Sequence, residues 1–490
     1  MKRTATLLLA ATVCMLANAL SVRLDAPGTL RDAVADAEST TQLALSGSID
    51  ASDFSFIADG MPALEQLDLS GATIVAYEGE ALQGIRRFPA ATLPQLLLAG
   101  SRISSVTLPD GLAAIGECAL AGTPLTAIVV PASVRTVGPG AFAGCTQLLT
   151  ADAGAATLGE GAFSGCTALS TVTLPAGAAV PARCFAGDAA LAAVNAPGIA
   201  SIGERAFAGC TALTALDFGT ELKEIGAHAF AGSGIAKADL AACTGLASIG
   251  SGAFAGCLAL EELTLPENAD IADAHALAMG DTHLTAITLP AGSVPAYAFT
   301  GAAAVDAAAV LKGATEVGEY ALKGATATHR VTLAATLEYL GDHAMEGMTG
   351  LERIYATELT AVPALGSDVW KGVEQPAVRL MPADDMIDAF RNADQWKEFD
   401  VRSVSSAGTI INEATGRLRA TFSDGLLLVE CTIAGVEGIT VADTEGRVLA
   451  TLVPDSDGRA ALDTSHWTTR IYLLATSGSA RANLKIARNF

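Results

Sequence analysis

The sequence is poor in aromatic, basic and histidine residues. Phe, Trp and Tyr make up only 5% of the chain, which argues against one large aromatic core and favours many small packing layers. Lys and Arg number 29 against 52 Asp and Glu, so the formal net charge is −23 at pH 7. Such an acidic chain is a poor nucleic-acid binder, because neutralising phosphates supplies most of that affinity. The six histidines are scattered and no C-x₂-C pair occurs, which argues against a zinc site.

Long hydrophobic runs are also lacking beyond the first residues. Residues 2–3 are basic, residues 5–16 are apolar, and residues 17–19 (Ala-Asn-Ala) have the small side chains that signal peptidase requires. This pattern predicts a signal peptide over residues 1–19. An uncleaved anchor is the alternative, but a membrane helix needs about twenty apolar residues. The alanine-rich segment 294–311 contains a proline and an aspartate, so we expect no transmembrane segment in the mature chain.

Cysteine pairs at a disulfide-framework spacing are absent, although export would permit disulfides. Four of the cysteines occupy the same place in a repeated A-F-x-G-C phrase: Cys145, Cys166, Cys210 and Cys257. We therefore expect a buried column of free thiols that fills a small interior site, with Cys145 and Cys166 reduced. A disulfide framework is the alternative.

The most informative feature that is present is an internal repeat, which decides the fold. Its phrase A-F-x-G carries a bulky residue in the second position. These bulky residues, which we call rungs, are about 22.7 residues apart on average, a leucine-rich-repeat spacing. The rungs are Leu120, Phe142, Phe163, Phe185, Phe207, Phe230, Phe254, Leu277, Phe299, Leu322, Met345 and Trp370, and Leu82 is a candidate for an earlier one.

Each unit also contains a phrase of the form L-x-x-I-x-L-P, for example in residues 169–175 and 284–290. Its alternation predicts a short strand with one buried face, which the proline ends. One strand per repeat, stacked in parallel at about 4.8 Å, predicts a solenoid. The unit at 305–327 lacks the strand proline and the unit at 260–283 has Leu277 in place of Phe, so we expect irregularity there.

These phrases resemble the BspA-like leucine-rich repeat family, and residues 125–147 (LTAIVVPASVRTVGPGAFAGCTQ) match its pattern closely. The resemblance covers roughly residues 60–400, and residues 381–400 resemble the closing unit of that family. It implies a bacterial protein, secreted or displayed on the cell surface outside the outer membrane. The family's role would be binding to host matrix proteins, other cells or glycans.

Both ends depart from the repeat. Residues 20–62 are expected to form an N-terminal cap over the first exposed layer of a solenoid spanning residues 63–404. From Ser405 the Ala-Phe-Gly phrase is replaced by alternating strands with Glu-Gly and Asp-Gly turns, which predicts a small β-sandwich over residues 405–490.

This tail is similar to the C-terminal sorting domains of type IX secretion cargo. The matching residues are Asp443, Gly446, Arg447, Ile471 to Leu474, Arg481, Lys485 and Arg488. Arg470 stands where that family usually has glycine, and the chain ends in Asn-Phe, so an unrelated accessory β-domain remains the alternative. The resemblance implies contact between residues 405–490 and secretion machinery.

No catalytic constellation emerges, and we expect neither an enzyme nor a cofactor. His228, His275 and His343 precede the A-F phrase in variable positions, where a structural or solvated histidine is the ordinary case. The glycines at 138–144 recur as a repeat corner and do not open a long helix, unlike a phosphate loop. An enzyme whose residues converge only in three dimensions is the remaining catalytic alternative.

Binding is better supported, because a solenoid offers a long regular face. The strand residues that flank the second apolar position point away from the core. Among them we single out charged and aromatic residues between 237 and 355 as a candidate contact strip for a protein or glycan, since Arg and Tyr often anchor interfaces. The strip consists of Lys237, Asp239, Glu262, Arg330, Arg353 and Tyr355. A structural spacer of the envelope or matrix, with no specific ligand, is the alternative function.

Overall fold

The computed structural model describes most of the chain and divides it into two compact units. The described residues are 19–79, 85–269, 271, 274–280, 283–402, 409–411, 418–423, 426–431, 438–443, 448–455, 459–463, 471–477 and 480–486. The first unit comprises residues up to Leu351 together with Pro363–Glu374, and the second comprises Glu352–Val362 together with Gln375–Phe490. The predicted signal peptide and the candidate rung Leu82 lie outside the described residues.

The first unit begins with the longest strands of the solenoid. Strands β1, β2 and β3 pair in parallel, and β7 joins the free edge of β3. Helix α2 starts at a capping box in which Asp50 and Asp53 each accept a backbone N–H at the helix start. The elements are β1 (Ala19–Leu24), α1 (Leu30–Ala33), β2 (Gln42–Ile49), α2 (Ala51–Gly60), β3 (Gln66–Ile74) and a hairpin of β4 (Tyr77–Glu78) with β5 (Arg87–Phe88).

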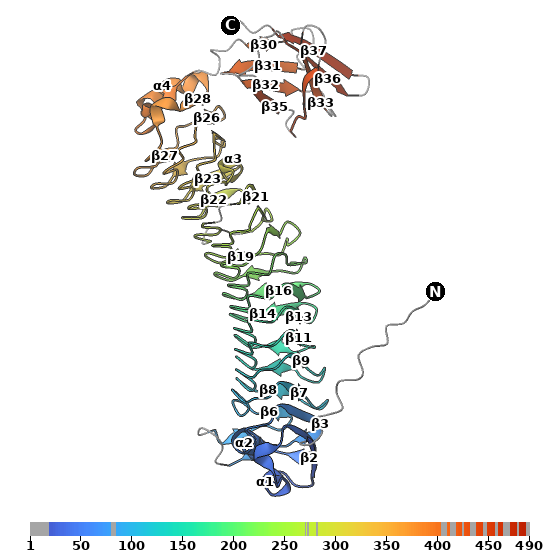
Figure 1. Ribbon diagram of the computed structural model, residues 1–490. Helices are drawn as coiled ribbons and strands as arrows, with labels where there is room; N and C mark the ends of the chain where they lie inside the picture. The colour runs from blue at the N-terminus through green and yellow to red at the C-terminus, as the bar shows by residue number, and fades with distance from the viewer. Residues whose placement is uncertain are drawn as a thin grey trace, which may run out of the picture. The chain divides into compact units, whose positions relative to one another are not determined.

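Most of the following coils carry two short parallel strands, stacked one coil upon the next (Figure 1). The first ladder follows the predicted L-x-x-I-x-L strands. Of the described segments with that phrase, only residues 215–217 form no strand, and the prediction is confirmed for the others. Its strands in this unit are β7 (Ser105–Thr107), β9 (Ala127–Val129), β11 (Thr150–Asp152), β13 (Thr171–Thr173), β15 (Ala193–Asn195), β18 (Lys237–Asp239), β20 (Glu262–Thr264), β21 (Ala286–Thr288) and β24 (Arg330–Thr332).

The second ladder was not predicted, because most of its strands have only two residues and show no alternation. Each of its strands ends directly before a glycine, as at Ile115-Gly116, or before a proline, as at Val180-Pro181. Its strands are β6 (Thr92–Leu93), β8 (Ala114–Ile115), β10 (Thr136–Val137), β12 (Thr157–Leu158), β14 (Ala178–Val180), β16 (Ile199–Ile202), β17 (Glu224–Ile225), β19 (Ser248–Ile249), β22 (Gly292–Val294), β23 (Ala314–Val317), β25 (Tyr339–Leu340) and β27 (Ala364–Leu365). In most coils the predicted strand is therefore accompanied by a second parallel strand.

The A-F-x-G corner forms a third line of contact between coils. Backbone N–H groups of one corner donate to carbonyls of the next, as Phe142 N does to Ala162 O at 2.8 Å and Gly144 N to Ser164 O at 2.8 Å. The buried rings stack with centroids 5.1 to 5.7 Å apart, from Phe142 through to Phe254. The ring spacing follows the coil spacing, so each coil supplies one layer of core.

The hydrogen bonds between corners show that one predicted rung is misplaced by one residue. Phe254 N donates to Leu277 O, and Ala278 N donates to Ala298 O, which puts Ala278 and not Leu277 in the rung position. Leu277 occupies the position of the alanine before the rung, and both side chains are fully buried. The prediction of Leu277 as a rung is wrong, because an extra residue in this coil shifts the register.

The structure also adds a rung before Leu120. Leu98 is fully buried, and Gly100 N donates to Ala121 O as the other corner glycines do. The sequence Leu-Leu-Leu-Ala-Gly at 96–100 has no Ala-Phe pair, which hid this coil.

Two coils interrupt the first ladder. At residues 215–217 no strand forms, and Phe218 packs edge-on against Phe230, with ring centroids 5.8 Å apart. In the coil that lacks the strand proline, helix α3 (Ala307–Leu311) replaces the strand, with Asp306 accepting a hydrogen bond from Ala308 N at its start. This confirms the expected irregularity of residues 305–327.

The second unit contains a parallel sheet followed by antiparallel strands. The parallel strands are β26 (Arg353–Ala356), β28 (Arg379–Pro382) and β29 (Asp400–Val401), and between the last two lies helix α4 (Ile387–Asn392). The ring of Trp396 is buried edge-on against Phe390. This segment includes the predicted closing unit at 381–400.

The tail forms two four-stranded antiparallel sheets, ordered β30-β31-β32-β35 and β34-β33-β36-β37. Leu427 and Val429 of one sheet and Ile439 and Val441 of the other are buried. These are the two sheets that the β-sandwich prediction requires. The strands are β30 (Thr409–Ile411), β31 (Leu418–Ser423), β32 (Leu426–Cys431), β33 (Gly438–Asp443), β34 (Val448–Leu452), β35 (Arg459–Asp463), β36 (Ile471–Ser477) and β37 (Ala480–Ile486).

Within the described part of the chain, no helix is long and apolar enough to cross a membrane.

Candidate functional site

Three residues of the predicted contact strip lie together on one sheet of the first unit. The register places Lys237 beside Glu262, and Asp239 beside Thr264. Lys237 Nζ lies 2.5 Å from Glu262 Oε2, and this contact raises the pKa of Lys237. The two side chains are about half exposed, so the pair is solvated and its charges largely offset one another.

The other three predicted residues are not brought to that sheet. Arg330 lies on β24, which is separated from β21 along the chain by helix α3. Arg353 and Tyr355 lie on β26 in the second unit, and the Tyr355 hydroxyl is buried. A buried hydroxyl cannot reach a partner without rearrangement, so Tyr355 is a weaker candidate than the sequence indicated.

A second exterior feature runs along the corners of the coils. Two residues before each rung the backbone is left-handed, with φ between +49° and +63° in every described coil. We call this set of positions the left-handed column. It comprises Leu96, Cys118, Gly140, Gly161, Arg183, Arg205, His228, Gly252, Ala276, Tyr297, Tyr320, His343 and Asp368.

Glycine adopts this conformation without steric cost, whereas a residue with a Cβ is strained by about 1 kcal/mol. Glycine fills the column at positions 140, 161 and 252, so the coil itself needs no side chain there. Bulky charged and aromatic residues nevertheless occupy most other positions. His228 and His343 stand in variable positions of the sequence, and no sequence pattern indicated that they belong to one column.

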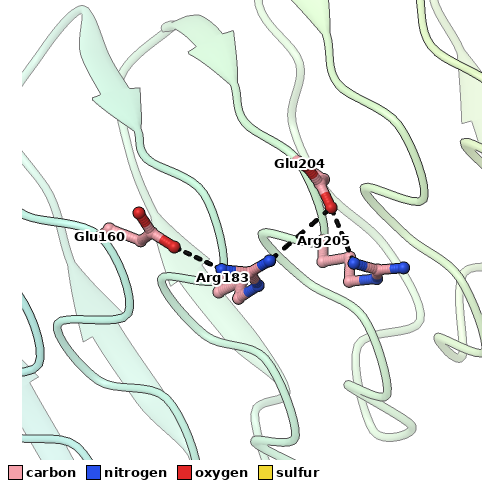
Figure 2. Close-up of polar contacts among 4 residues, drawn as sticks. All are labelled: Glu160, Arg183, Glu204 and Arg205. Carbon is pink, nitrogen blue, oxygen red and sulfur yellow. Dashed lines mark hydrogen bonds and ion pairs between the residues drawn. The ribbon is translucent and has the colours of Figure 1, made fainter.

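The middle of the column is charged (Figure 2). Arg183 Nη1 lies 2.5 Å from Glu160 Oε1, and Arg183 Nη2 lies 3.9 Å from Glu204 Oε1. Arg205 Nη1 binds the same Glu204 carboxylate at 2.7 Å. These side chains are about half exposed, so the two guanidinium groups remain open to solvent on one side.

The C-terminal part of the column is aromatic. The rings of Tyr297 and Tyr320 stack with centroids 5.2 Å apart, and Tyr320 stacks on His343 at 4.6 Å. Lys323 Nζ lies 4.8 Å from the centroid of the Tyr320 ring and 3.3 Å from Glu346 Oε2. The stack is therefore flanked by an ion pair supplied by the same coils.

No site for metal chemistry accompanies these surfaces. In the described residues, no group of three or more His, Cys, Asp or Glu side chains is arranged to hold a metal ion. The eight cysteines from Cys118 to Cys431 form no disulfide bond in the structure, and Cys145, Cys166, Cys210 and Cys257 are fully buried as expected for a thiol column. Burial is the main cause that raises the pKa of Cys210, which keeps this thiol protonated and unreactive.

Bacterial leucine-rich repeat proteins are among the solved structures to which this chain is similar. No curated protein matches the sequence. Among solved structures, a leucine-rich repeat protein from Bacteroides ovatus is 17% identical, with a TM-score of 0.49 over 75% of this chain and 85% of the other. A leucine-rich cell surface protein from Faecalibacterium prausnitzii is 21% identical, with a TM-score of 0.34 over 56% and 85%. The pneumococcal vaccine antigen PcpA is 11% identical, with a TM-score of 0.26 over 74% and 84%.

The family follows from a model of the BspA-type leucine-rich repeat region, which matches in six copies. The matched residues are 97–188, 178–305 and 292–363, which together make up more than half of the 490 residues. The match begins in the coil of the newly identified rung Leu98 and ends in the last coils of the first unit. This chain belongs to the BspA-type leucine-rich repeat family.

Proposed function

We propose that this protein is exported and displayed on a bacterial cell surface, where it binds a protein or glycan of a host or neighbouring cell and catalyses no reaction. The family membership and the signal-peptide pattern support this proposal. One observation carries it: the left-handed column exposes charged and aromatic side chains at positions where glycine would satisfy the fold.

Two properties of the column support binding: the backbone strain of its bulky residues and the exposure of their side chains. Each bulky residue in the column bears backbone strain that glycine avoids. Arg183 and Arg205 are about half exposed, and Tyr297 is 38% exposed, so these groups are accessible to a partner. Arginine and tyrosine are also the residues most often found at the energetic centres of protein interfaces.

The test is a binding screen with the mature protein against matrix proteins and a glycan array. A column variant carries Arg183→Gly, Arg205→Gly, Tyr297→Gly and Tyr320→Gly, because glycine adopts the left-handed backbone without steric strain. A matched control carries Thr171→Ala and Thr173→Ala on the first ladder. We expect the column variant to remain folded by circular dichroism and to lose at least tenfold in affinity, while the control binds normally.

The strand-face residues Lys237, Asp239 and Glu262 are a competing surface for the same function. A Lys237→Ala, Glu262→Ala variant would weaken binding if that surface carries the contact and leave it unchanged if the column does. Absence of any ligand for the intact protein would overturn the binding proposal and support the spacer function instead.

We also infer that residues 405–490 direct export as a type IX sorting domain. Their antiparallel strands support this: Asp443 ends β33, residues 471–474 lie in β36, and Arg481 lies in β37. The matching residues Gly446, Arg447 and Arg488, and the departing residue Arg470, lie outside the described residues. The proposed division is a cap at 20–62, a solenoid at 63–404 and this tail.

A further inference from the structure

The aromatic part of the left-handed column ends at Tyr297. Side chains in this column lean toward the following coil: a Cβ on Gly140 would lie 3.0 Å from Cys118 Sγ, and one on Gly252 would lie 2.5 Å from His228 Nδ1. Tyr320 and His343 therefore each receive the ring of the coil before them. The column residue of the preceding coil is Ala276 and that of the coil before it is Gly252, so neither supplies a ring to Tyr297.

One face of the Tyr297 ring is thus left without an aromatic neighbour. Among the described residues, the only ring that stacks on Tyr297 is Tyr320, on the following coil. The side chain is 38% exposed. An exposed aromatic face beside a small residue can accept a flat or charged group from another molecule.

The next coil shows which group such a tyrosine accepts in this protein. Three residues after Tyr320, Lys323 places its ammonium 4.8 Å from the ring centroid, and Glu346 holds that ammonium at 3.3 Å. The same position after Tyr297 is Thr300, which has no charge. Tyr297 therefore lacks the neighbouring ammonium group that Lys323 provides to Tyr320.

The negative charges around Tyr297 also favour binding of a cation there. Desolvation and the neighbouring Glu319 carboxylate raise the pKa of Tyr297, so an acidic group lies close to its hydroxyl. Lys323, the nearby positive charge, is offset by Glu346. Over longer distances the net charge of −23 attracts basic ligands and repels acidic ones.

We propose that the exposed face of Tyr297, with Glu319 beside it, binds an arginine or lysine side chain of a partner protein. This inference rests on the proposed binding function and names the chemistry of one contact within it. The partner's cation would lie on the face of the Tyr297 ring opposite Tyr320, whereas the corresponding face of Tyr320 is covered by Tyr297 itself.

The test is a titration of the mature protein with a short fluorescein-labelled peptide that contains arginine, followed by anisotropy. The matched neutral probe has citrulline in place of each arginine, which keeps the planar group and removes the charge. We expect Tyr297→Ala to weaken binding of the arginine peptide about 2- to 5-fold, the range that a cation–π contact of about 0.5–1 kcal/mol at an exposed site gives. The citrulline peptide should show no dependence on residue 297.

Three variants separate this contact from general attraction to an acidic surface. Tyr339→Ala is the matched control, because Tyr339 is exposed to the same 38% but lies on the second ladder. Tyr297→Phe keeps the ring face and should bind nearly as the intact protein does. Tyr297→Leu keeps apolar bulk without the ring and should weaken binding as alanine does. Circular dichroism melting of each variant confirms that the coil is folded.

Several outcomes overturn the inference. One is an equal effect of Tyr297→Ala and Tyr339→Ala on peptide binding. Another is stronger dependence on Tyr297 for a neutral glucose oligosaccharide than for the arginine peptide, which would make the face a sugar platform. If the surface screen finds a partner and Tyr297→Ala binds it unchanged, the inference fails while the proposed function stands. If the intact protein binds no partner, the proposed function itself fails.

Discussion

Asp188 lies in the interior position that four other coils fill with cysteine, directly after the corner glycine. Its side chain is fully buried, and Oδ1 accepts a hydrogen bond from Cys166 N at 2.8 Å, whereas Oδ2 has no hydrogen-bond partner among the described residues. Burial raises the pKa of Asp188 to about 8. The carboxyl group is therefore mostly protonated at neutral pH.

This raised pKa makes stability depend on pH in a definite direction. The unfolded chain releases the Asp188 proton near its ordinary pKa of 3.8, while the folded chain keeps it up to about pH 8. Unfolding is thus increasingly favoured as pH rises from about 4 to 8, by at most about 5 kcal/mol at 1.36 kcal/mol per pH unit. Asp188→Asn should remove this dependence and stabilise the protein at pH 9, as measured by urea unfolding at pH 5, 7 and 9.

Asp239→Asn is the matched control, because Asp239 is exposed on β18 and should leave the pH profile unchanged. If Asp188→Asn lowered stability equally at all three pH values, the ionisation of Asp188 would not be the source of the pH dependence.

At the scale of the corner element, two glycines separated by one residue have different roles. Gly161 has φ +62° and a Cβ there would meet only Ser164 Cβ at 3.7 Å. Gly159 has no such backbone constraint, but a Cβ would lie 2.5 Å from Pro139 N in the preceding coil. Gly161→Ala should cost about 1 kcal/mol, as strain alone predicts. Gly159→Ala should cost about 3 kcal/mol, because coil backbones would have to separate.

Thermal unfolding of the two glycine variants, followed by circular dichroism, measures this difference. Equal losses of stability would show that close approach between coils does not constrain Gly159.

The ring stack gives a prediction for a single layer. Phe207 lies between Phe185 and Phe230, with centroid distances of 5.4 and 5.5 Å. Phe207→Ala should remove about 3–5 kcal/mol by leaving a cavity. Because a coil is coupled mainly to its neighbours, hydrogen exchange should accelerate around residues 185–230 and remain unchanged around residues 97–120. Unchanged exchange around residues 185–230 would contradict the role of the rings.

The sequence predicted the elements that repeat and missed those that depend on neighbouring coils. The rungs and first-ladder strands recur in most repeats, so alternation and spacing identified them. The shift from Leu277 to Ala278 is marked in the sequence only by Gly280, because a rung stands two residues before the corner glycine and the bulkier Leu277 obscured that spacing. The left-handed column escaped prediction because its residues share a φ angle rather than a chemical type. Asp188 could have been found, since it follows the same corner glycine as the thiols.

At the scale of the whole molecule, the tail provides a test of separability. A chain that ends at Val404 keeps β26, β28 and β29, and with them the closing segment. We expect it to fold and bind normally, because each coil takes its stability from adjacent layers. In the native host we expect it to remain in the periplasm, detected by cell fractionation and by protease accessibility of intact cells.

The control is the full-length chain, which should reach the surface in the same cells. Normal surface display of the truncated chain would contradict the sorting function of residues 405–490. Loss of solubility would show instead that the tail is a structural cap, to which the 2.6 Å ion pair between Arg459 and Glu358 would contribute.

The corner hydrogen bonds also determine how the first unit would respond to mechanical force. They join each coil to the next, so tension applied along the stack loads them in series and the weakest interface carries the same force as the strongest. Coils would then detach one at a time, beginning where α3 or residues 215–217 interrupt the first ladder. Each detached coil of about 23 residues would release slack of about 3.4 Å per residue, so the first unit would lengthen gradually under load rather than rupture suddenly.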